Sequence, residues 1–222
     1  LGGFDEITYA PTEEVILSAA GDIKQVQPEG EQMGISADHL SVAAGGDVSL
    51  GVLEQNGGNF VREADIEAGR SVILGFSIDD TRLSVNQSQS GLINGDFMLI
   101  GENEHIDFVN GELDVAGDMS VLAQNVTGLD SAQAQGQLQI ALSGDETFTV
   151  NHLAGRYVGL VAQKAEMNIG RIDSASSVDV VKLDTQNPSS LTISEITADD
   201  RVLVVNGAGK VALNDVLAGS EI

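Results

Sequence analysis

The sequence has no cysteine and no tryptophan, and its 222 residues include only three prolines and eight aromatic residues. Without cysteine there can be no disulfide, no thiolate nucleophile and no cysteine-ligated metal. The shortage of large rings excludes a globular core centred on aromatic side chains, so Val, Leu, Ile and Ala must fill the interior. The run of about 18 apolar residues that a membrane-spanning helix needs is also missing, so we expect no membrane insertion.

Basic residues are scarce as well. Ten Lys and Arg stand against 34 Asp and Glu, which gives a formal net charge of −24. Nucleic-acid binding depends on neutralising phosphates with Lys and Arg, so we expect no nucleic-acid partner. Anionic membrane surfaces are excluded by the same argument. We expect the charge to keep the chain soluble and to oppose self-association, with cation binding as the second interpretation.

Glycine, with 26 residues, and short apolar segments of period two are abundant. The clearest example is residues 191–216, where LTISEI and VALNDV carry one apolar pattern twenty residues apart and RVLVVN lies between them. Alternation of period two predicts strands with one buried face. The return to the same pattern predicts a chain that coils and stacks each coil on the one before.

This pattern recurs about every 23 residues along the chain. The predicted fold class is all-β, a right-handed parallel β-helix of about nine coils. We expect residues 15–222 to form this single domain, as part of a longer shaft or filament, and residues 1–14 to be a leading segment or cap. The first residue of one strand in each coil marks the repeat, at Ile23, Val48, Val72, Phe97, Met119, Phe148, Met167, Leu191 and Val211.

The repeat also predicts which side chains point inward and where the pattern is interrupted. Two polar stretches, 79–91 and 128–136, are expected to be loops. A helix over 132–142 or 158–168 is the alternative suggested by the Ala and Gln content, but the apolar spacing favours strands. The side chains expected to stack in inward-facing columns are Val48, Leu50, Val72, Leu74, Val121, Ile169, Leu191, Ile193, Val202, Val204, Val211 and Leu213.

Several coils turn at a Gly-Asp dipeptide, as at Gly46-Asp47, where Gly permits positive φ and we expect Asp to bond its own backbone. The repeats LSVAAGGDVSLGVL (40–53), LINGDFMLIG (92–101), LDVAGDMSVLAQNV (113–126) and VLVVNGAGKVALNDV (202–216) resemble those of filamentous-haemagglutinin-like bacterial exoproteins. Autotransporter passengers and other secreted β-helices share this degenerate motif. The family's amino-terminal secretion domain is not recognisable.

The resemblance implies a right-handed β-helical shaft on a secreted or cell-surface bacterial protein, with a structural or adhesive role. It implies no site residues, because the repeats mark folding positions. We therefore expect a non-catalytic extracellular shaft whose partners are neighbouring copies or further coils of the same polypeptide, stacked head to tail, and surface glycans. One alternative is a carbohydrate-active β-helix of the polysaccharide hydrolase or lyase type. The other is the subunit of a fibre that polymerises head to tail.

Hard-cation binding is the chemistry that the acidic residues favour most. Carboxylates and turn carbonyls are the oxygen ligands that Ca²⁺ prefers, so the candidate metal ligands are Asp79, Asp80, Asp199 and Asp200, which would bind Ca²⁺ loosely. The sequence has neither the nonapeptide array of a calcium β-roll nor a DxDxDG loop. No other cofactor is expected.

Catalytic chemistry finds little support. The same paired acids invite comparison with polysaccharide hydrolases, which use two carboxyl groups as acid and base. However, the basic and aromatic residues that would hold a sugar substrate are almost absent. The three histidines, His39, His105 and His152, occupy unrelated places in the repeat, and only His105 has other metal-ligating residue types close by, so a transition-metal site is not expected.

Overall fold

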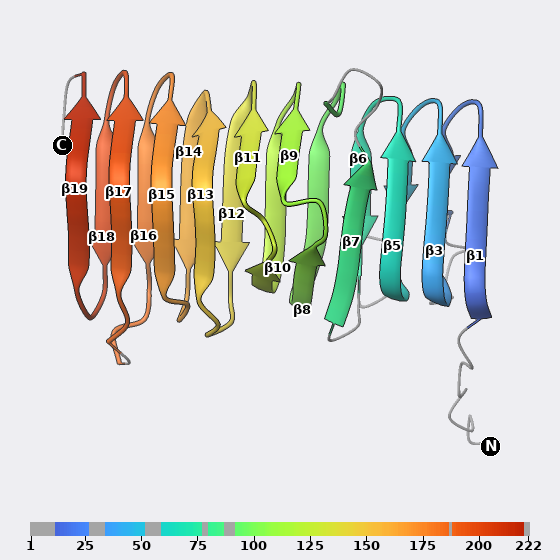
Figure 1. Cartoon of the computed structure of the whole chain (residues 1–222), viewed down its shortest axis with the longest axis horizontal. Coiled ribbons are helices and arrows are strands. Elements are labelled where there is room, and N and C mark those ends of the chain that lie inside the picture. The colour runs from blue at the N-terminus through green and yellow to red at the C-terminus, as the bar shows by residue number, and fades with distance from the viewer. Residues whose placement is uncertain are drawn as a thin grey trace.

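The computed structural model describes residues 12–26, 34–51, 59–76, 80–86, 92–186 and 188–219. All regular elements in these residues are strands, which lie in two rows along an elongated molecule (Figure 1). The pairings between described strands are parallel, and they make a β-solenoid of about eight turns. The described residues contain no helix that is long and apolar enough to cross a membrane. The expected all-β parallel solenoid is thus confirmed, whereas its right-handed sense stays a prediction.

The front row in Figure 1 consists of β1 (Thr12–Ala19), β3 (Ser36–Ala44), β5 (Phe60–Ala68), β7 (Asp80–Asn86), β9 (Glu112–Val115), β11 (Ser131–Ala134), β13 (Phe148–Gly155), β15 (Met167–Ser174), β17 (Leu191–Ala198) and β19 (Val211–Ala218). The rear row consists of β2 (Ile23–Lys24), β4 (Val48–Leu50), β6 (Val72–Gly75), β12 (Gln137–Leu142), β14 (Tyr157–Ala162), β16 (Val178–Lys182) and β18 (Val202–Asn206).

Two longer strands, β8 (Phe97–Phe108) and β10 (Met119–Thr127), connect the rows. The first part of β8 pairs with rear strand β6, and its last part, 105–108, pairs with front strand β7. β10 pairs with both parts of β8 and continues the rear row into β12. The strand pairing is therefore continuous between the two rows at β8 and β10.

The repeat markers expected from the sequence belong to two different columns, which is a correction. Those up to Met119 stack in the rear row, but Phe148 and the later markers stack in the front row. Strands of both rows alternate in the same way, so the apolar pattern cannot distinguish them. The true rear column, at intervals of 19 to 25 residues, is Ile23, Val48, Val72, Phe97, Met119, Leu138, Val158, Val178 and Val202.

Both stretches expected to be loops contain strands. Strand β7 occupies 80–86, and Leu83 and Val85 are buried there. Strand β11 occupies 131–134, where Ala132 and Ala134 are the inward-facing residues. The apolar residues of these two strands are few or small, so their alternation is too weak to predict a strand. The helical alternative for 132–142 and 158–168 is also wrong, because strands and turns fill both ranges. Residue Asp79 and residues 87–91 lie outside the described part.

The predicted core is buried except at three positions on the last coil. Nine of the twelve expected side chains, from Val48 to Val202, have at most 4 % of their surface exposed. The other three, Val204, Val211 and Leu213, lie on the last coil, and Val211 and Leu213 are 46 % and 37 % exposed. Strand β1 begins at Thr12, three residues before the expected start, whereas residues 1–11 are not described. The division into a cap and one domain stays a prediction.

The Gly-Asp corners join one coil to the next. The Asp96 Oδ1 atom accepts the backbone N–H of Asp118, at 2.9 Å, and the Asp118 Oδ1 atom accepts that of Gln137, at 2.8 Å. The expectation that Asp bonds its own backbone is therefore wrong at these corners. The same bond links successive members of the whole corner ladder, which is Asp22, Asp47, Ser71, Asp96, Asp118 and Gln137.

The glycine of the Gly-Asp dipeptide is required for a different physical reason. A Cβ on Gly117 would overlap the Asp96 Oδ1 atom of the preceding coil and would lie 2.8 Å from the Gly95 carbonyl oxygen. Glycine is thus required because the preceding carboxylate packs against its Cα. At the start of the ladder, the pKa of Asp22 lies below its ordinary value because its carboxylate accepts the Asp47 N–H and pairs with Arg70.

Candidate functional site

A groove follows the edge where the front strands turn toward the rear row. Two adjoining hollows form it, with volumes of about 310 and 680 Å³. They share Ala134, Gln135 and Ala154, so we treat them as one feature, the axial groove. Its polar lining residues are Asp114, Gln133, Gln135, Arg156, Asp173, Ser174, Thr197 and Asp199, and its small ones are Ala134, Ala154, Gly155 and Ala175.

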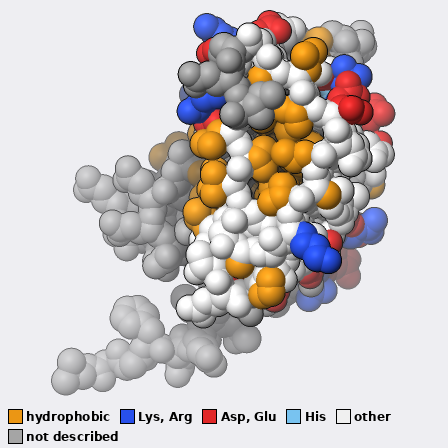
Figure 2. Space-filling view, turned by 90° about the vertical axis from the view of Figure 1, so that its left-hand side faces the viewer, with side chains coloured by type: hydrophobic (Ala, Val, Ile, Leu, Met, Phe, Trp, Pro, Cys, Tyr) orange, Lys and Arg blue, Asp and Glu red, His pale blue; other side chains and the backbone are white. Residues whose placement is uncertain are grey.

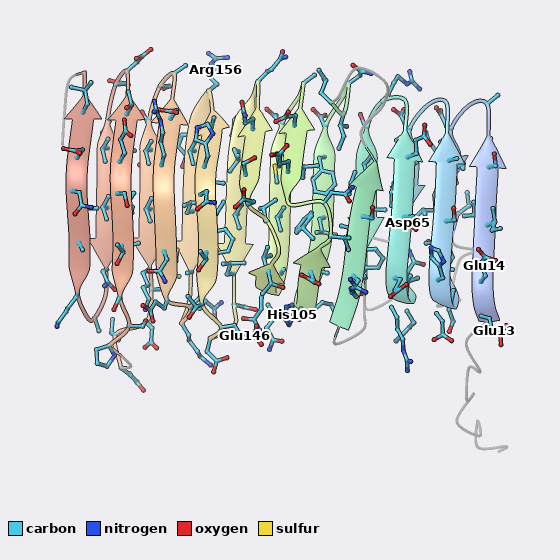
Figure 3. The ribbon with its side chains drawn as sticks, in the orientation of Figure 1. Glu13, Glu14, Asp65, His105, Glu146 and Arg156 are labelled. Atoms are coloured by element: carbon cyan, nitrogen blue, oxygen red, sulfur yellow. The ribbon has the colours of Figure 1, made fainter. Side chains whose placement is uncertain are left out.

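The groove arises from the register of successive coils. An outward-facing column crosses it in the order Asp114, Gln133, Ala154, Asp173 and Thr197. Ala154 supplies the shortest side chain of this column, so a hollow opens between its longer neighbours. Arg156 lies in the turn after β13, at the upper edge of the molecule in Figure 3.

Most polar side chains of the axial groove have unused hydrogen-bonding capacity. The side chains of Asp114, Gln133, Gln135, Arg156, Thr197 and Asp199 make no hydrogen bond or ion pair within the described part of the chain. Arg156 is notable because other arginines of this acidic chain pair with carboxylates, as Arg201 does with Asp179 at 2.8 Å. The groove therefore presents both donors and acceptors to solvent.

Asp173 is the carboxylate of the groove that is already engaged. It accepts hydrogen bonds from Arg171 Nε at 2.7 Å and from His152 Nε2 at 2.9 Å. Partial burial acts to raise the pKa of Asp173, but these bonds outweigh it and hold the pKa below the ordinary value of 3.8. Asp173 is therefore an anchor between coils, and its charge is partly neutralised.

We expect Asp173→Asn to destabilise the protein by about 1 kcal/mol near neutral pH. The folded-state pKa of Asp173 is lowered, so its ionised form contributes stability above the ordinary carboxyl pKa. This contribution disappears as the pH falls through the lowered pKa. Denaturant unfolding of parent and variant at a series of pH values should show their difference vanish in acid. Asp114→Asn, which removes an unengaged carboxylate, should show no comparable pH-dependent difference.

A separate hollow, of about 330 Å³, is lined by Thr81, Arg82, His105, Asp107 and Thr127. His105 Nε2 lies 2.9 Å from Thr127 Oγ1, and the Thr127 hydroxyl donates to Asp107 Oδ1 at 3.1 Å. That geometry makes His105 Nε2 the donor toward Thr127. Arg82 Nε lies 3.7 Å from Asp107 Oδ2, and His105 Nδ1 lies 3.6 Å from Glu146 Oε2. These groups bind one another and link successive coils, and His105 and Glu146 lie at the lower edge of the molecule in Figure 3.

The predicted metal ligands that the structure describes, Asp80, Asp199 and Asp200, are not brought together. Asp199 lines the axial groove, and Asp200 occupies the same turn between β17 and β18. Asp80 begins β7, which pairs with β5 and β8, whereas β17 pairs with β15 and β19, and Asp79 lies outside the described residues. The described ranges contain no group of three or more His, Asp or Glu arranged to hold a metal ion. Ca²⁺ binding by these residues stays a prediction.

The sequence did not single out the residues that give the groove its character. Gln133 and Gln135 fall in or beside β11, which lies in a stretch predicted to be a loop, and no sequence pattern marks Arg156. The signal was Ala154-Gly155, a pair of small residues where neighbouring coils carry longer side chains. This signal can be recognised only when the register between coils is known, because the register shows which residues lie beside Ala154.

Comparison of the sequence with protein-family models and curated proteins, and of the structure with solved structures, finds no match. Function therefore has to follow from the solenoid and the axial groove.

Proposed function

We propose that this chain is a segment of an extracellular, non-catalytic β-solenoid shaft with a structural and adhesive role on a bacterial surface or secreted protein. The observation that carries the proposal is the continuous inward-facing column from Ile23 to Val202, in which each coil is the support for the next. Such a stack extends in one dimension and holds side surfaces at fixed positions. The acidic exterior keeps neighbouring shafts apart.

The C-terminal end of the stack favours head-to-tail contact. Val211 and Leu213 continue the columns of Leu191 and Ile193, which are at most 1 % exposed, but are themselves 46 % and 37 % exposed. Hydrophobic side chains form a central patch on this end of the molecule (Figure 2). An apolar end with unpaired strand edges is stabilised when another coil packs on it. Further coils of the same polypeptide or a second copy would both provide that coil.

A fibre subunit is the second form of this proposal, because contacts between opposite ends do not close into a ring unless the rotation permits it. In that case the 222-residue chain forms rods that lengthen with protein concentration. The acidic sides keep the rods separate until divalent cations bridge them, so added Ca²⁺ should bundle them laterally.

Leu213→Asp tests the end contact, because it places a charge on the exposed apolar end. We expect the parent chain to sediment as concentration-dependent oligomers, seen as rods by electron microscopy, and the variant to remain monomeric. Leu183→Asp is the matched control, since Leu183 is 54 % exposed on the side of the stack and should not alter assembly. A parent chain that stays monomeric with and without Ca²⁺ contradicts the fibre and leaves the coil-by-coil shaft.

A carbohydrate-active enzyme is the other candidate, and one observation favours it. Three carboxylates, those of Asp114, Asp173 and Asp199, line one groove. Glycoside hydrolysis needs two carboxyl groups at a defined separation across a sugar bond. Asp173 is bound by Arg171 and His152, which makes it a poor proton donor. Release of reducing ends from neutral or acidic polysaccharides would establish this candidate in place of the shaft.

A further inference from the structure

We infer that the axial groove binds an uncharged, hydroxyl-rich linear chain, a neutral glycan, which lies along the solenoid axis. This inference rests on the adhesive part of the proposed function and names the ligand class of the same groove. The groove is open along its length and crosses the coils of β9, β11, β13, β15 and β17. A ligand that contacts all of them is extended, since successive coils are stacked about 4.8 Å apart.

The polar groups of the groove match hydroxyl groups. Carboxylates accept only, the guanidinium of Arg156 donates only, and the amides of Gln133 and Gln135 do both. A sugar hydroxyl both donates and accepts, so one chain of hydroxyls can satisfy this mixed set. The small residues Ala134 and Ala154 at the base let such a chain approach the backbone closely.

Other ligand classes fit less well. Polyanions meet three carboxylates against one guanidinium, in a chain whose net charge is −24. Polycations meet Arg156 in the turn beside the hollow. An extended peptide binds a sheet through a free strand edge, but β11 and β13 are paired on both sides. A neutral hydroxylated chain avoids all three conflicts.

Among the described residues, the lining includes no aromatic ring on which a sugar could stack. Each sugar unit therefore contributes through hydrogen bonds alone, and binding of a single unit is weak. Affinity must then accumulate along the chain, so the dissociation constant is expected to fall with oligomer length until the groove is filled. This length dependence distinguishes a groove from a pocket for one sugar.

The experiment is calorimetric titration of the 222-residue chain with neutral glucose and N-acetylglucosamine oligomers of increasing length. Oligomers of a uronic acid and of lysine are the charged comparisons. We expect the neutral oligomers to bind more tightly as they lengthen and the charged ones not to bind. Ala154→Gln places a long side chain in the hollow and should abolish binding. Arg156→Ala should weaken binding about fivefold.

Arg62→Ala is the matched control, because Arg62 is exposed on another coil, 3.7 Å from Asp38, and should leave binding unchanged. Circular dichroism checks that each variant is folded. Equal binding by the parent and Ala154→Gln, or binding of only charged oligomers, overturns the inference, as does binding of no oligomer at all. Sedimentation of the same samples separates this failure from that of the shaft, since assembly through the end coil does not depend on the groove.

Discussion

Replacement of Ile193 by Asp is expected to destabilise the protein by about 4 kcal/mol, the largest effect of any single change proposed for this chain. Ile193 is 1 % exposed and stacks between Ile169 and Leu213 in the front row. A carboxylate at this position is buried between two aliphatic side chains. The cost therefore exceeds that of losing the isoleucine packing alone.

In a solenoid each coil contacts only its neighbours, so the loss of stability is expected to unfold the mutated region before the rest of the molecule. The two coils that contain β17 and β19 should detach at a lower denaturant concentration than the rest. Hydrogen exchange resolved by segment, together with urea unfolding, measures both effects. Ser194→Asp introduces the same charge at the adjacent exposed residue and should change stability by less than about 0.5 kcal/mol. If both variants unfold like the parent, Ile193 does not point inward.

Strands β17 and β19 show how much of the fold could be predicted from the sequence. In residues 191–216 the pattern was predicted correctly because LTISEI and VALNDV occupy neighbouring coils of one row, with Ile196 stacked on Val216. The repeat could be followed within one row, as from Phe148 to Val211 in the front row, although the coils differ in length. It failed between Met119 and Phe148, where the expected step passes from the rear row to the front row. Alternation records which face is buried, but it does not record which row a strand belongs to.

The axial groove was beyond prediction for a related reason. Asp114, Gln133 and Asp173 are ordinary surface residues in the sequence, and Ala154 is an ordinary small one. They form a groove only because the register aligns them across coils, and that register depends on turn lengths that vary from coil to coil.

Lys182 is a core residue that the sequence pattern could not predict. It occupies the inward position after Val178 and Val180, and only 1 % of it is exposed. Its Nζ atom makes no hydrogen bond within the described residues. Ala162, which pairs with it one coil earlier, is small enough to leave room for the long side chain. A lysine in an alternating strand predicts an outward-facing residue, so the inward position of Lys182 could not be predicted.

Gly117→Ala is expected to cost about 3 kcal/mol, which would make it the largest effect at a surface turn. The new Cβ would overlap the Asp96 Oδ1 atom and would lie 2.8 Å from the Gly95 carbonyl oxygen. Asp96→Ala alone should cost only about 1 kcal/mol, because the Asp118 N–H that loses its acceptor is exposed and water can replace the carboxylate.

The double variant separates steric overlap from lost hydrogen bonding. Removal of the Asp96 carboxylate takes away the closer of the two overlaps at Gly117, so the combined cost should fall below the sum of the single costs by about 1 kcal/mol or more. Gly21→Ala is the matched control, because Gly21 occupies the same place in a Gly-Asp corner of the first coil and a Cβ there meets no atom within 4 Å. Urea unfolding of the four proteins and the parent supplies the comparison. Additive costs at Gly117 and Asp96, or an equal cost at Gly21, would mean that glycine serves these corners through backbone freedom and not through the close approach of the preceding coil.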